Sequence, residues 1–140
     1  MTDPVVSTAK TGVRRMYAPK VIRSRTIRRH DLGPDHIGVL MTDIHAEGSI
    51  RYAYLLAILR RGIDAPIAYV SSEPKPRRRY VPPGFEDNTG SHFLCSFTPS
   101  GHMNYGASDD WGDEATFEAR ALEMARTLIL RGGAPTPSIP

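Results

Sequence analysis

The residues of this sequence best suited to chemistry are arginines, and they gather in two short segments. Guanidinium groups donate hydrogen bonds in a fixed fork that matches the oxygen atoms of phosphate and carboxylate groups. One segment lies within residues 21–29 and the other within residues 75–80. The side chains that we expect to bind ligand are Arg23, Arg25, Arg28, Arg29, Lys75, Arg77, Arg78, Arg79 and Tyr80.

These two segments favour a phosphate-bearing ligand, either a nucleic acid or a nucleotide, bound without catalysis. Each arginine could neutralise one phosphate, and Tyr80 could stack on a base. The charge is also unevenly distributed: residues 1–36 carry a net +5, whereas residues 92–140 carry a net −3. The alternative is therefore a protein-interaction module, such as a small inhibitor or adaptor, whose basic arm docks on a protein partner or on a second copy of the chain.

The elements around these segments predict a strand, a helix and a second strand. The apolar run 37–44 is typical of a central strand covered on both faces. Ser49 can cap a helix that Gly62 would end, and residues 66–70 have the composition of the next strand. At this spacing the three elements favour a right-handed βαβ unit.

Asp43 and His45 form a further candidate site, at the end of the first of these strands. A strand that ends in Asp-x-His before a helix with a Leu-Leu pair resembles the opening of the calcineurin-like metallophosphoesterases. The resemblance implies a divalent metal bound by both residues. His92 and His102, which would face each other across a hairpin, could complete this metal site. Residues 69–73 depart from that family, since they read Tyr-Val-Ser-Ser-Glu where it has Gly-Asp. A metal-dependent phosphoesterase is our second alternative, and the favoured interpretation has no catalytic residue, metal or cofactor.

The complete pattern predicts an α+β fold. Residues 92–98 and 102–107 have the composition of a β-hairpin, and a last helix begins at Asp113 or Thr116. The sheet is then mixed, with four or five strands that include the βαβ unit and the hairpin, and it carries two helices. The predicted organisation is a basic N-terminal arm (1–36), a compact α/β domain (37–133) and a disordered tail (134–140).

Length and composition set the remaining expectations. A chain of 140 residues suits one domain, and its single cysteine, Cys95, excludes an internal disulfide. No stretch approaches the roughly 20 apolar residues that cross a bilayer, and residues 1–10 lack the apolar core of a secretory signal. We therefore expect a cytoplasmic protein that does not bind membranes and that could form a homo-oligomer.

Overall fold

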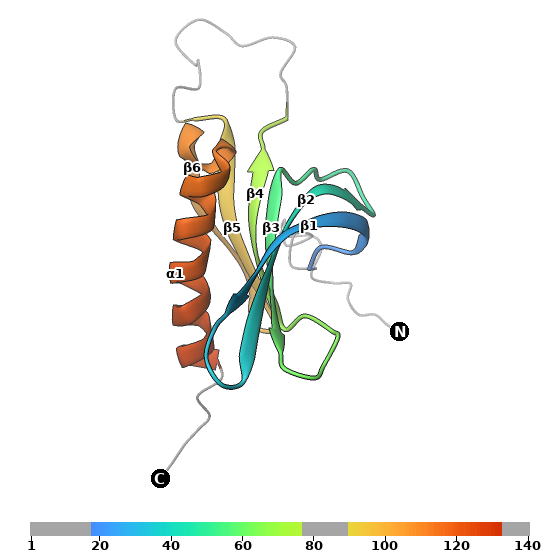
Figure 1. Cartoon of the computed structure of the whole chain (residues 1–140). Helices are drawn as coiled ribbons and strands as arrows, with labels where there is room; N and C mark the ends of the chain where they lie inside the picture. Colours follow the sequence, from blue (N-terminus) through green and yellow to red (C-terminus); the bar gives the residue numbers. More distant parts are fainter. Residues whose placement is uncertain (1–17, 77–89, 133–140) are drawn as a thin grey trace, which may run out of the picture.

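The computed structural model describes residues 18–76 and 90–132, which form one antiparallel sheet and one long helix. Each strand pairs with the next strand along the chain, so the order in the sheet is the order in the sequence. The elements are β1 (Val21–Asp31), β2 (His36–Ala46), β3 (Tyr54–Arg60), β4 (Ala68–Pro74), β5 (His92–Thr98), β6 (Gly101–Ser108), the 3₁₀ turn η3 (Asp109–Gly112) and α1 (Glu114–Gly132). Figure 1 shows α1 lying along one face of the sheet.

The predicted fold class is wrong, because the first predicted helix is a strand. Residues 54–60 form the strand β3 instead of a helix, so the described residues contain six antiparallel strands and no βαβ unit. A short apolar run has no period that separates a buried strand from a buried helix. Burial on both faces decides the outcome, because Leu55, Leu56 and Ile58 are all completely inaccessible to solvent.

The connection after β3 explains why the next strand runs antiparallel. Gly62 has a φ of 83°, as the prediction required, but it shapes the turn after a strand, where the amide of Ile63 donates to the carbonyl of Arg60 at 3.1 Å. A parallel crossover needs a dozen or more residues, and residues 61–67 are too few. The strand β2 is likewise not central, since it lies next to the edge strand β1.

The hairpin and the last helix are confirmed. The strands β5 and β6 pair directly, although His102 lies opposite Phe97 and His92 lies opposite Ser108, so the two histidines do not face each other. Asp113 caps α1, because its carboxylate accepts hydrogen bonds from the Thr116 amide (3.0 Å) and hydroxyl (2.7 Å). These bonds lower the pKa of Asp113.

The core lies between α1 and the sheet. Phe117, Ala121 and Ala125 form a completely buried stripe along α1, as helical spacing requires. They belong to one cluster with buried side chains of the strands, among them Leu40, Leu56, Ile58, Val70 and Leu94. Within the described ranges, no helix is long and apolar enough to cross a membrane.

Candidate functional site

The first predicted arginine segment forms β1, an edge strand of the sheet. All four of its arginines are exposed. Arg25 donates a hydrogen bond to Asp43 at 2.8 Å, and this bond, together with the charge of Asp43, raises the pKa of Arg25. Arg23 and Arg29 make no ion pair with any residue that the structure describes. Only these two therefore keep a guanidinium group that is available to an outside anion.

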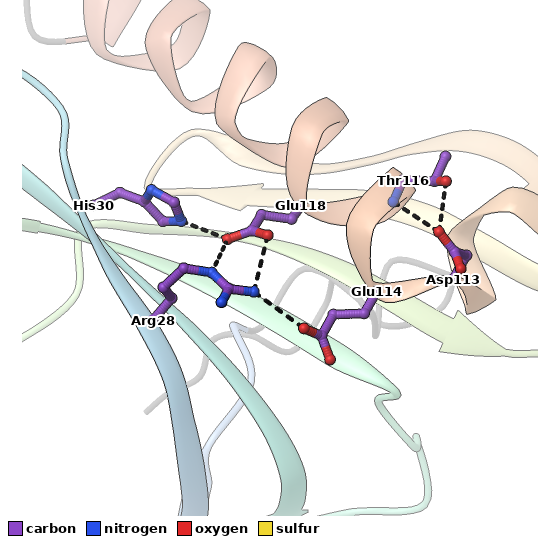
Figure 2. A network of polar contacts seen from close by, with 6 residues as sticks. All are labelled: Arg28, His30, Asp113, Glu114, Thr116 and Glu118. Atoms are coloured by element: carbon purple, nitrogen blue, oxygen red, sulfur yellow. Dashed lines mark hydrogen bonds and ion pairs between the residues drawn. The ribbon is translucent and has the colours of Figure 1, made fainter.

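Arg28 instead connects β1 to α1 (Figure 2). It donates to Glu118 at 2.7 Å and to Glu114 at 3.1 Å, and the His30 ring nitrogen lies 2.6 Å from the same Glu118 carboxylate. The hydrogen bond from Arg28 is the largest cause of the lowered pKa of Glu118. The basic start and the acidic end of the chain thus already meet within one molecule.

The second predicted segment is described only at its beginning. Lys75 follows β4, which β2 and β3 separate from β1, so the structure does not place this lysine beside the β1 arginines. Its ammonium group lies 5.4 Å from the centre of the Phe93 ring, a cation–π contact. Arg77, Arg78, Arg79 and Tyr80 lie outside the described residues.

The predicted metal ligands do not lie between a strand and a helix. Asp43 and His45 are both exposed within β2, and the next element is the strand β3. Asp43 is paired with Arg25, and His45 lies opposite Arg23. No group of three His, Cys, Asp or Glu residues that could hold a metal occurs in the described part of the chain.

The structure instead reveals a cavity of about 650 Å³ between the sheet and the last turns of α1. Its lining includes His36 at the start of β2 and Arg131 in the last turn of α1. Figure 1 shows that the start of β2 and the end of α1 lie at the same end of the molecule. Residues from β2 to β6 and from α1 line it. Its apolar wall includes Ile58, Ile67, Leu128 and Ile129, so it is a mostly apolar space.

A few polar side chains interrupt this apolar wall. His36, the first residue of β2, is 9% exposed, and its Nε2 atom is buried without a hydrogen-bond partner among the described residues. The hydroxyl groups of Ser96 and Tyr105 lie 3.1 Å apart and bond to each other. His36 therefore brings an unmet hydrogen bond to the edge of the cavity.

Comparison of the chain with protein families, curated proteins and solved structures finds no match. The function has to be inferred from the geometry of the cavity and of β1.

The cavity residues were not predicted from the sequence. Arg60 lies within the segment predicted to be a helix, whereas it ends β3 and lines the cavity beside His36. Had residues 54–60 been taken as a strand, an antiparallel pairing with β2 would have brought these two residues together. Nothing in the local sequence marks Ser96 or Tyr105, which meet only because β5 and β6 pair.

Proposed function

We propose that this protein binds a small, mostly apolar molecule in the cavity beneath the end of α1. Ligand sites are concave, measure roughly 300–1,000 Å³ and combine apolar walls with a few polar groups that orient the ligand. The cavity of about 650 Å³, with Ile58, Ile67 and Leu128 in its wall, has both properties. The function is non-enzymatic storage, transport or sensing of that molecule.

The unpartnered nitrogen of His36 is the observation that carries this proposal. A buried polar atom without a hydrogen bond costs about 1–3 kcal/mol of stability. The nitrogen has almost no accessible surface, so the His36 ring would have to turn toward the cavity for the polar group of a ligand to meet it. The apolar part of the ligand would then cover the surrounding wall.

A neutral fluorescent probe, N-phenyl-1-naphthylamine, tests this function. We expect its emission to rise when it binds the protein and to stay low with Thr98→Trp, because Thr98 lines the cavity and a tryptophan there would fill it. Thr26→Trp is the matched control, since Thr26 is exposed on β1 and does not line the cavity. Equal binding to both variants would contradict the proposal.

A second candidate function, binding of a nucleic acid or nucleotide through the basic segments, is supported by one observation. Arg23 and Arg29 are exposed on an edge strand and are not paired with a carboxylate in residues 18–76 or 90–132. Arg25 and Arg28 are already paired, which limits the strength of such binding.

Salt dependence tests this second candidate. With a labelled oligonucleotide, Arg23→Ala together with Arg29→Ala should reduce the slope of log affinity against log salt by about 2, because each phosphate contact contributes roughly one. Arg120→Ala is the control, because Arg120 is an exposed arginine of α1 that pairs with Glu123. A slope that the double variant leaves unchanged would exclude β1 as the contact surface.

A further inference from the structure

The charges around the cavity give information about its ligand. Among the described residues that line it are two arginines, Arg60 and Arg131, which carry a positive charge, but no Asp or Glu. Apolar cavities that accept neutral molecules have no need of such an excess of cations. The lining therefore favours a negatively charged ligand.

Both arginines are available to a ligand. In residues 18–76 and 90–132, neither Arg60 nor Arg131 forms an ion pair, whereas the neighbouring Arg61 is bonded to Asp31 and to the carbonyl of Gly33. Arg60 and Arg131 are also exposed, which places their guanidinium groups where the cavity meets solvent. Cations at the entrance hold an anionic group in place without burying its charge.

The positions of these groups around the apolar wall suggest how a ligand is oriented. Arg60 lies directly opposite His36 in the β2–β3 pairing, so a guanidinium group and an imidazole flank the same side of the cavity. Ile58, two residues before Arg60 on the same face of β3, is completely buried. A molecule with its charge at Arg60 and its apolar part against Ile58 would extend from the entrance to the interior.

The C-terminal end of α1 disfavours an anion in the cavity, and the charge of Arg131 offsets this effect. The last carbonyl groups of a helix carry a partial negative charge that disfavours a nearby anion. Arg131 lies in the last turn of α1 and lines the cavity. Its charge offsets the helix dipole at the point where the ligand enters.

We infer that the ligand is an amphipathic organic oxyanion, either a carboxylate or a phosphate monoester, with its charged group between Arg60 and Arg131 and its apolar part beneath Leu128. Guanidinium groups bind both kinds of oxyanion through paired hydrogen bonds. This inference rests on the proposed function, because it assumes that the cavity is occupied.

Three naphthalene compounds of similar shape test this inference: 2-naphthoate, 2-naphthyl phosphate and the neutral 2-naphthalenemethanol. Fluorescence titration of the full chain should show that at least one anion binds about tenfold more tightly than the alcohol, with an affinity that falls as salt is added. The double variant Arg60→Gln with Arg131→Gln should abolish this preference and leave the alcohol unaffected. Arg126→Gln is the control, because Arg126 is exposed on α1 and does not line the cavity.

The possible results test the oxyanion inference and the proposed function separately. Equal affinities for the anions and the alcohol, or an anion preference that survives in the double variant, would overturn the oxyanion inference but leave the cavity as a binding site. Failure of all three compounds and of the neutral probe would overturn the proposed function as well. The tighter of the two anions would identify the charged group.

Discussion

The two ends of the interface between α1 and the sheet differ sharply in packing. At the beginning of α1, Phe117 is completely buried and stacks on Tyr54, with ring centres 5.7 Å apart, and the Ser72 hydroxyl donates to the carbonyl of Trp111. At the end of α1, Leu128 and Ile129 remain partly exposed beside the cavity. One helix thus has a tightly packed half and a half whose last turns border the cavity.

This difference indicates a division of roles along a single helix. Protein interiors normally pack as densely as organic crystals, and unfilled volume lowers stability. Packing at the beginning of α1 can offset the stability that is lost where the end of α1 borders the cavity. A ligand site can then exist in a small domain, because most of the core residues, such as Phe117, Ala121 and Leu94, do not line the cavity.

The largest effect should come from the packed half. Phe117→Ala should lower the free energy of unfolding by about 3–5 kcal/mol, as expected when a buried aromatic ring leaves a hole. Leu128→Ala should lower it by only about 1 kcal/mol, because this side chain is partly exposed and already borders a cavity. Urea unfolding followed by tryptophan fluorescence measures both values. Similar losses for the two variants would mean that the two halves do not differ in their contribution to stability.

The glycines provide a smaller test of the same contrast. Gly90 has a φ of 117°, and a Cβ atom placed there would lie 2.3 Å from the backbone of Ser108; Gly62 has a φ of 83° and open space around it. Gly62→Ala should cost about 1–2 kcal/mol for backbone conformation alone. Gly90→Ala should cost about 1–3 kcal/mol more, because the backbone has to move. Equal shifts in Tm would argue against close packing at Gly90.

The smallest effect concerns the link between β1 and α1. Glu118→Gln should cost about 1–2 kcal/mol at neutral pH, since it weakens charged hydrogen bonds to Arg28 and His30. The pKa of Glu118 is lowered in the folded protein from its ordinary value of 4.5, so its contribution is fully present above that pH and is lost as the pH falls through the lowered value. The difference between variant and parent should therefore shrink in acid.

A second variant of α1 serves as the control for Glu118→Gln. Glu123→Gln removes a carboxylate that is 69% exposed and pairs with Arg120, and it should change the stability by less than about 0.5 kcal/mol at any pH. Stability curves from pH 3 to 7 for both variants would separate the two sites. A Glu118→Gln effect that stays constant across this range would show that the charge of Glu118 is not involved.

Much of the secondary structure could be predicted from local patterns. The strands β2, β5 and β6 follow from apolar composition and turn residues, and the start of α1 follows from the capping side chain of Asp113. Residues 54–60 could not be assigned in this way, because they are apolar at every position before Arg60 and are rich in leucine and alanine, which favour helices. This one error turned an antiparallel sheet into a βαβ unit.

The candidate cavity was beyond local prediction for a different reason. Its lining comes from five strands and one helix, so it exists only when the whole sheet is assembled. His36 carries no special signal in the sequence, and its importance arises from burial without a hydrogen-bond partner among the described residues. The basic segments were visible in the sequence, but the pairing of Arg28 with Glu118, 90 residues away, was not.

The order of the strands has a consequence for how the molecule folds. Because each strand pairs with its neighbour in sequence, the hairpins β1–β2 and β5–β6 can form early, from short loops and at small entropic cost. The contact of α1 with β1 has to wait until the helix has been synthesised, because Glu118 follows Arg28 by 90 residues. On the ribosome, the sheet should therefore expose its core face until the last helix emerges, and it is during this interval that the protein is most exposed to aggregation.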